Sequence, residues 1–406
     1  MVRSDDPALT AVRGVAALWV FVYHAWVTAV PQLLIVNFGT LALDFTPLAS
    51  VGWAGVDIFY VLSGFLLFGM FDDWASGRTS TVALSKYAER RALRILPPYY
   101  GQLAVLAVLG FTTTLVERPT LGNLVSHATL THAWFANYLV TMNGIWWTLS
   151  IEAQYYVLLP MLACLIRRKG WTSVIVAGLI VTVAWRAGAL EAVRGEPIPR
   201  RVWLIEQLPG RIDQFLFGMF AQHLVRATDT RAAAIRGWLL VPRWRFRLAV
   251  AAGPIVLVAL AYLLHVDSFF LRYWDGHPWL YFWHTTAAIG VATTLYALAI
   301  RNSAAAPTSP RDSVSGFRGG WLPRALVGMG TISYSFYLWH EVLLRWIAPT
   351  IAKLVGAGGT LAVFAGNLTI GFAVALLTAI GWYLALERPF LRQRARLREA
   401  TTSPGR

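Results

Sequence analysis

The chain has 406 residues, of which 57% are hydrophobic and only 14% are charged, and 19 of them are tryptophans. Soluble globular domains carry about a quarter charged residues, so this chain has too few polar side chains to cover a folded surface in water. Its mean hydropathy is +0.55, and apolar runs recur from end to end. This composition excludes a soluble enzyme, a secreted scaffold and a disordered regulator, and it places the chain in a lipid bilayer.

The formal net charge of +15 comes from 35 Lys and Arg against 20 Asp and Glu. The basic residues cluster between the apolar runs, which is how the positive-inside rule orients a membrane protein. A phosphate-tracking groove is the weaker interpretation, so we expect a lipid bilayer and no nucleic acid as partner. The single cysteine, Cys164, excludes an internal disulfide and a cysteine-built metal site, and we expect no metal.

Windows of about 19 residues predict roughly ten membrane-spanning helices. The sixth is the least regular, because Pro209, Arg211, Asp213 and Gln214 interrupt it. We therefore predict an all-α polytopic membrane protein in the form of a helical bundle. The predicted limits are 10–34, 52–71, 97–116, 146–166, 171–190, 205–225, 248–265, 279–300, 324–347 and 360–386.

The distribution of Lys and Arg over the predicted loops gives the orientation. One set of alternate loops and ends holds 26 of them and the opposite set holds eight, which predicts that both termini are cytoplasmic. We expect one transmembrane domain over 1–390, with a linker at 304–320, and a basic cytoplasmic tail over 391–406 that lies against anionic headgroups. A multi-pass protein of the cell (plasma or inner) membrane follows.

Four of the ionisable residues inside predicted spans stand out. An ionisable group at the bilayer centre costs roughly 2.5–3.5 kcal/mol on insertion scales, so each is a functional candidate. At 1.5 Å per helical residue, all four fall in the outer half of the membrane. Such agreement is not expected of scattered structural polar residues, although each could also serve a neighbouring helix. They are His24, Asp57, Glu152 and His340.

Arginines form a contrasting group on the cytoplasmic side. Arg13 precedes His24 by eleven residues, which places both on one helix face about 16 Å apart. Arg91 and Arg94 are spaced i, i+3 and can point together. They suit a positive-inside anchor, or a site for a phosphate-bearing donor, because guanidinium groups bind phosphate bidentately. In the second case the reactive end of the donor would reach up the bundle towards His24.

Aromatic residues surround the fourth span. Trp147 and Tyr155 suit helix packing and the interfacial belt, and they could also form a platform for a substrate. Together with His340 they are our candidate substrate-binding residues.

The sequence resembles the acyltransferase-3 family of integral membrane acyltransferases. Five ordered motifs carry the resemblance over roughly 80% of the chain. They are Arg13 and His24 with ten residues between them, Gly55-Val56-Asp57-Ile58-Phe59-Tyr60-Val61-Leu62-Ser63-Gly64-Phe65, Arg91-Ala92-Leu93-Arg94 with Pro97 and Tyr99, Trp147-Thr148-Leu149-Ser150-Ile151-Glu152-Ala153-Gln154-Tyr155-Tyr156, and Ser333-Tyr334-Ser335-Phe336-Tyr337-Leu338-Trp339-His340.

The resemblance implies a ten-helix bundle, without a fused esterase domain, that transfers an acyl group from acetyl-CoA or another acyl-CoA. The acceptor would be a hydroxyl of a carbohydrate, a glycolipid or a glycosylated small molecule. His24 would be the catalytic base, and Arg13, Arg91 and Arg94 would bind the donor. Tyr60 stands where the family often has Phe, and Ala153 where it often has a second Glu.

Several alternatives stay open. Either Asp57 or Glu152 could hold the far nitrogen of His24 and stabilise the imidazolium that forms. The acyl group could pass directly to the acceptor or through a covalent acyl-His intermediate. A proton-coupled transporter that uses the His, Asp and Glu residues as a relay is the alternative function.

Overall fold

The structure is a computed structural model that describes residues 6–29, 33–229, 243–267, 278–304, 320–355 and 359–393. The chain forms two compact units. Unit 1 comprises Met1–Tyr23, Leu33–Thr81 and Gln154–Thr331, and unit 2 comprises His24–Gln32, Val82–Ala153 and Ile332–Arg406. The predicted linker 304–320 and the predicted tail 391–406 lie outside the described residues, apart from their ends.

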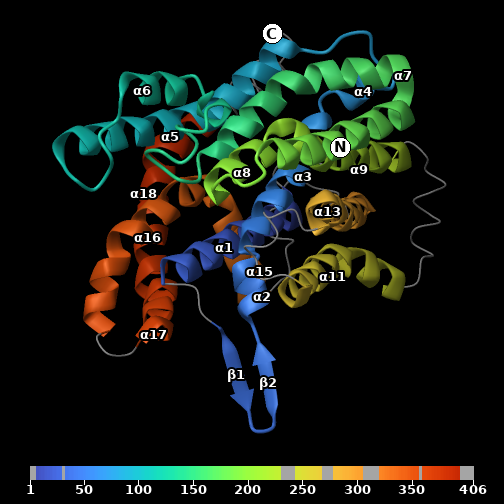
Figure 1. Cartoon of the computed structure of the whole chain (residues 1–406). Helices are drawn as coiled ribbons and strands as arrows, with labels where there is room; N and C mark the ends of the chain where they lie inside the picture. The colour runs from blue at the N-terminus through green and yellow to red at the C-terminus, as the bar shows by residue number, and fades with distance from the viewer. Residues whose placement is uncertain are drawn as a thin grey trace. The chain divides into compact units, whose positions relative to one another are not determined.

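Helices make up most of both units (Figure 1). Two of them, α1 and α7, contribute to both units. In chain order the helices are α1 (Pro7–Thr28), α2 (Thr46–Ser50), η1 (Gly52–Ala54), α3 (Gly55–Phe68), α4 (Asp72–Ala75), α5 (Leu84–Thr112), α6 (Leu121–Ala128), η2 (His132–Trp134), α7 (Trp147–Ala192), α8 (Ile198–Ile205), η3 (Leu208–Arg211), α9 (Ile212–Asp229), α11 (Arg243–Asp267), α13 (Trp279–Ala304), α15 (Trp321–Thr331), α16 (Ser333–Val355), α17 (Gly359–Gly366), η5 (Asn367–Gly371), α18 (Phe372–Trp382) and η6 (Tyr383–Glu387).

Every predicted span falls mainly on helix, with shifted limits. Two predicted spans join in α7, whose helical geometry is interrupted at Gly170 with φ +79°. The last span passes through two π-helical turns, η5 and η6. Among the described residues five helices are long and apolar enough to cross a membrane: Pro7–Thr28, Leu84–Thr112, Trp147–Ala192, Trp244–His265 and Gly359–Gln393. The protein is therefore a largely helical membrane protein, while ten crossings and cytoplasmic termini stay predictions.

A β-hairpin departs from the all-helical expectation. Strands β1 (Ile35–Phe38) and β2 (Leu41–Asp44) pair antiparallel, and Gly39 lies in their turn with φ +62°. The hydroxyl of Tyr262 on α11 donates a hydrogen bond to the carbonyl of Asp44 at 2.7 Å. The predicted first span runs to residue 34, beyond the end of α1 at Thr28, because hydropathy does not locate the last residue of a helix.

The core of unit 1 depends on a close crossing of α3 and α9. A Cβ placed on Gly64 would lie 2.2 Å from the backbone oxygen of Phe215, and one on Gly218 would lie 2.1 Å from that of Val61. Small residues at such crossings let two helix backbones approach, which is how helices associate where lipid replaces water. Helix α13 packs against both members of this pair, and α11 packs on α13 (Figure 1).

A buried polar cluster ties unit 2 together. The amide of Gln102 on α5 donates to the carbonyl of Leu338 at 2.6 Å, and Asn143 donates to the same oxygen at 2.9 Å. Trp146 Nε1 donates to the side-chain oxygen of Gln102 at 3.0 Å. Hydrogen bonds that satisfy buried groups in this way fix the register between segments far apart in sequence. They hold α5 and the segment just before α7 on α16.

We predict that Gly218→Ala destabilises unit 1, because the new methyl group collides with the backbone of α3. Overpacking of this kind typically costs about 1–3 kcal/mol. Gly188→Ala on α7 is the matched control, because a Cβ there meets nothing within 4 Å; it should be neutral or stabilise by up to about 1 kcal/mol. Thermal unfolding in detergent measures both. Equal midpoints for the two variants would contradict the close crossing.

Candidate functional site

His24 lies in the last turn of α1, and its backbone is held from two sides. The hydroxyl of Thr28 donates to the carbonyl of His24 at 2.7 Å. The amide of Asn367 donates to the carbonyl of Ala25 and to the hydroxyl of Thr28, each at 3.0 Å. The side chain of His24 is half-buried. The backbone of His24 is therefore fixed, while the residue keeps some accessible surface.

The ring of His24 meets His340 on α16. Nδ1 of His24 lies 3.3 Å from Nε2 of His340, and the ring centroids are 5.0 Å apart with planes at 70°. His340 has no exposed surface, and its Nδ1 faces the carbonyl oxygens of Tyr337 at 2.8 Å and Phe336 at 3.2 Å. The structure thus brings two of the predicted site residues together. The contact is with an imidazole where we expected a carboxylate.

Glu152 and Arg94 share a tyrosine neighbour in unit 2. The hydroxyl of Tyr334 on α16 donates to the carbonyl of Ile95 at 2.9 Å. It interacts electrostatically with the carboxylates of Glu152 and Glu387 and with the guanidinium group of Arg94. Glu152 is half-buried in the first turns of α7, among the charged and phenolic groups of this unit.

Arg91 belongs to the same unit. It lies half-buried on α5 and interacts electrostatically with Tyr87, as Glu152 does. Arg91 and Arg94 are both on the continuous helix α5, so their i, i+3 spacing holds.

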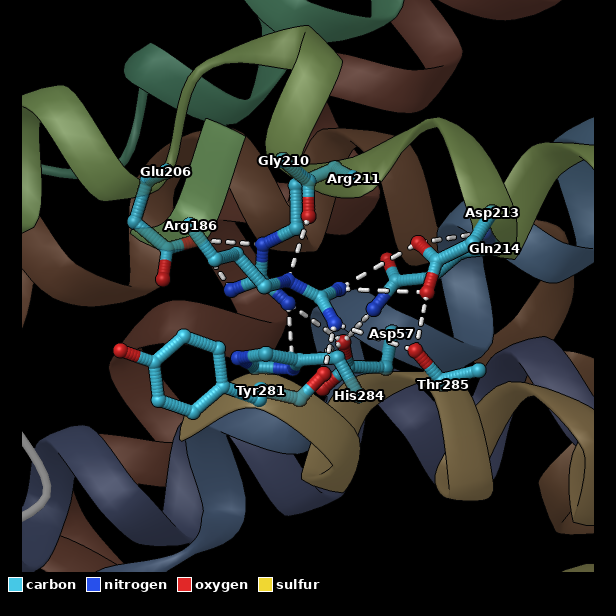
Figure 2. Close-up of polar contacts among 10 residues, drawn as sticks. All are labelled: Asp57, Arg186, Glu206, Gly210, Arg211, Asp213, Gln214, Tyr281, His284 and Thr285. Atoms are coloured by element: carbon cyan, nitrogen blue, oxygen red, sulfur yellow. Dashed lines mark hydrogen bonds and ion pairs between the residues drawn. The ribbon is translucent and has the colours of Figure 1, made fainter. Parts of the chain in front are cut away.

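Asp57 lies in unit 1, inside a buried network of ion pairs (Figure 2). Its Oδ1 atom accepts hydrogen bonds from Arg211 Nη1 at 2.8 Å and from the amide of Gln214. Nδ1 of His284 lies 2.8 Å from the same oxygen and also contacts Arg211. Arg211 pairs in turn with Glu206. Asp57 is only 1% exposed, so its carboxylate is enclosed by these partners.

A second arginine completes this network. Arg186 on α7 pairs with Asp213 at 3.2 Å and donates to the carbonyls of Gly210 at 3.0 Å and Tyr281 at 2.7 Å. It also donates to the hydroxyl of Thr285 at 3.0 Å, and that hydroxyl donates to Asp213 at 2.5 Å (Figure 2). The network joins α3, α7, α9 and α13, together with the turn before α9.

The charges of the network nearly balance. Three carboxylates, those of Asp57, Glu206 and Asp213, face two guanidinium groups. Sequence reasoning missed Arg186, Glu206 and His284 as partners. The polar residues that interrupt the sixth span were the available signal. The sequence alone does not show which helices supply their partners.

The remaining predicted residues occupy different settings. Arg13 is half-buried on α1, which is continuous to His24, so the spacing that places both on one face holds. Trp147 is half-buried at the start of α7. Tyr155 is fully buried in unit 1 and stacks on Phe215 at 4.0 Å between centroids, which is a packing environment.

Unit 2 contains a second pair of imidazoles, and both of its residues are buried. The rings of His127 and His132 stack at 4.2 Å between centroids, with planes 3° apart. Burial, reinforced by the neighbouring His127, lowers the pKa of His132 to about 3. Burial also lowers the pKa of His127. Both rings are therefore neutral at neutral pH. Among the described residues no group of three or more His, Cys, Asp and Glu could hold a metal ion.

Comparisons with known proteins agree with the sequence motifs. A family model described as an acyltransferase domain (acyltransferase-3) matches residues 6–387. Acyltransferase MdmB of Streptomyces mycarofaciens is 25% identical over 98% of this chain and 95% of its own length. The exopolysaccharide production protein ExoZ of Rhizobium meliloti is 24% identical over 87% of this chain and 93% of its own.

A longer relative matches as well. The peptidoglycan O-acetyltransferase OatA of Listeria monocytogenes is 22% identical over 86% of this chain, which spans 51% of that protein. No solved structure matches the chain.

We predict that Asp57 and Arg211 stabilise unit 1 as a pair. Asp57→Ala or Arg211→Ala alone leaves a buried charge without its partner, a change that typically costs about 3–5 kcal/mol. The double variant should lose clearly less than the two single losses combined. Unfolding midpoints of the three variants in detergent measure this coupling. Strictly additive losses would show that the pair contributes no coupling energy.

Proposed function

The chain belongs to the acyltransferase-3 family, and from this membership we propose that it moves an acyl group from a cytoplasmic acyl-CoA to a hydroxyl of a carbohydrate-containing acceptor. The protein is an acyltransferase that transfers groups other than aminoacyl groups. The names of two relatives, one an exopolysaccharide production protein and one a peptidoglycan O-acetyltransferase, support acetyl as the group and carbohydrate as the acceptor. The cell membrane would be the place of the reaction.

The observation that carries the proposed chemistry is the position of His24. It is half-buried, its backbone is held by Thr28, and its ring contacts the fully buried His340. Transfer to an alcohol requires a base that removes the hydroxyl proton during attack. A neutral imidazole contributes about 10²–10⁴-fold in this role. His24 meets that need better than Asp57, whose carboxylate is enclosed by cationic and amide donors.

The proposed step balances as follows. The acceptor hydroxyl gives its proton to His24 while its oxygen attacks the thioester carbonyl of the donor. The resulting tetrahedral intermediate collapses, the carbon–sulfur bond breaks, and the CoA thiolate takes the proton from the imidazolium. The products are the acyl ester and free CoA. A covalent acyl-His24 intermediate stays the alternative route.

Arginines on α1 and α5 are the proposed donor site. Arg13, Arg91 and Arg94 are each half-buried. Planar guanidinium forks bind phosphate oxygens bidentately, and CoA carries three phosphate groups. Asp57 and Glu152 remain the candidate acidic groups of the site. Of the three residues proposed to contact the acyl acceptor, Trp147 is half-buried, whereas Tyr155 and His340 are fully buried.

We expect the detergent-purified protein to release free thiol from acetyl-CoA or another acyl-CoA, faster when a carbohydrate acceptor is present. A panel of donors and acceptors read as free thiol tests this, with acylated product confirmed by mass. No thiol release with any donor would contradict the proposal. Substrate-driven proton uptake by sealed vesicles, without covalent change to the substrate, would point to the transporter instead.

A further inference from the structure

The protons on His340 can be placed from its surroundings. Its Nδ1 lies within hydrogen-bonding distance of two backbone carbonyls, those of Tyr337 and Phe336. A carbonyl oxygen only accepts, so Nδ1 of His340 must carry a proton. The ring has no exposed surface and lies parallel to the ring of Phe336, with 5.6 Å between centroids. Such a setting disfavours a second proton and its charge, so Nε2 of His340 holds a lone pair.

The same reasoning then fixes the protons on His24. Nε2 of His340 faces Nδ1 of His24 at 3.3 Å. One of two nitrogens in hydrogen-bond contact must donate, and Nε2 of His340 is the acceptor. Nδ1 of His24 is therefore the donor, and the lone pair of neutral His24 is on Nε2.

The hydrogen-bond acceptor, His340, is held rigidly. Ser335 on the same helix donates to Glu387 at 2.7 Å, and the hydroxyl of Tyr337 lies 2.7 Å from that of Thr148. The carbonyl of Leu338 accepts from Gln102 and Asn143. Four segments of unit 2 thus hold the stretch of α16 that ends in His340. A rigid partner is what keeps a catalytic ring in its productive orientation.

We propose that His340 is a positioning residue that selects the tautomer of His24 and so makes Nε2 of His24 the base. This inference rests on the proposed function. The sequence predicted that His340 contacts the acyl acceptor. In this proposal His340 acts on the reaction through His24. When His24 takes the acceptor proton on Nε2, its Nδ1–H still points at the neutral ring of His340. That ring stabilises the imidazolium without competing for its positive charge.

Two substitutions of His340 separate this role from packing. His340→Leu keeps apolar volume and removes the acceptor, so kcat should fall about tenfold or more, equivalent to about 1.4 kcal/mol, while KM for acyl-CoA stays within twofold. His340→Gln restores an amide oxygen that can accept from Nδ1 of His24, and it should recover most of kcat. His132→Leu and His132→Gln, at a buried imidazole of the other pair, control for general loss of packing.

A spectroscopic measurement tests the tautomer without activity. ¹⁵N spectra of histidine-labelled protein in bilayers distinguish protonated from unprotonated ring nitrogens, and comparison with His24→Ala identifies the His24 signals. We expect a protonated Nδ1 and an unprotonated Nε2 in the parent protein, and loss of that preference in His340→Leu.

The outcomes separate the two proposals. A parental His24 protonated on Nε2, or an unchanged kcat in His340→Leu where His24→Ala is inactive, overturns the positioning role alone. If the parent transfers no acyl group, the proposed function fails, and the spectra still decide whether His340 sets the tautomer. If His340→Leu does not fold, the parental spectrum decides by itself.

Discussion

An ionisable side chain inside an apolar helical bundle must find its partners within the protein, because lipid offers none. This constraint shapes both units. In unit 1 it produces a network in which Asp57, Arg211 and their neighbours pair with one another across four helices. In unit 2 it produces the contact between His24 and His340. The cost of burying each group is offset only by the geometry of the packed helices.

The two solutions differ in what they leave accessible. Asp57 is 1% exposed, and its Oδ1 atom accepts from Arg211 and Gln214 and contacts Nδ1 of His284. Such a carboxylate is suited to holding helices together. His24 is half-buried and rests against a neutral partner whose own proton is engaged by backbone carbonyls. A base must exchange a proton with a substrate, so the second arrangement suits catalysis and the first suits stability.

Hydropathy predicted the helices well, because a long run of apolar residues is enough to identify a helix in lipid. The same approach missed the hairpin at Ile35–Asp44, since a short apolar strand has no distinct hydropathy. The helix-depth calculation placed His24 and His340 in one layer, and the structure brings their rings together. Within unit 1, two partners of Asp57 are distant in sequence: Arg211 is 154 residues away and Gln214 is 157 residues away. No local pattern specifies such pairs, because they depend on how α3 and α9 cross at Gly64 and Gly218.

The most direct test measures donor binding and thiol release in the parent, His24→Ala and Arg91→Ala. It separates the proposed role of His24 as the base from that of Arg91 in donor binding. We expect His24→Ala to bind acetyl-CoA like the parent but to release thiol at least about 100-fold more slowly, within the range of general-base catalysis. Arg91→Ala should bind the donor more weakly. Parental turnover by His24→Ala would contradict the central role given to this imidazole, and parental donor affinity in Arg91→Ala would remove that arginine from the donor site.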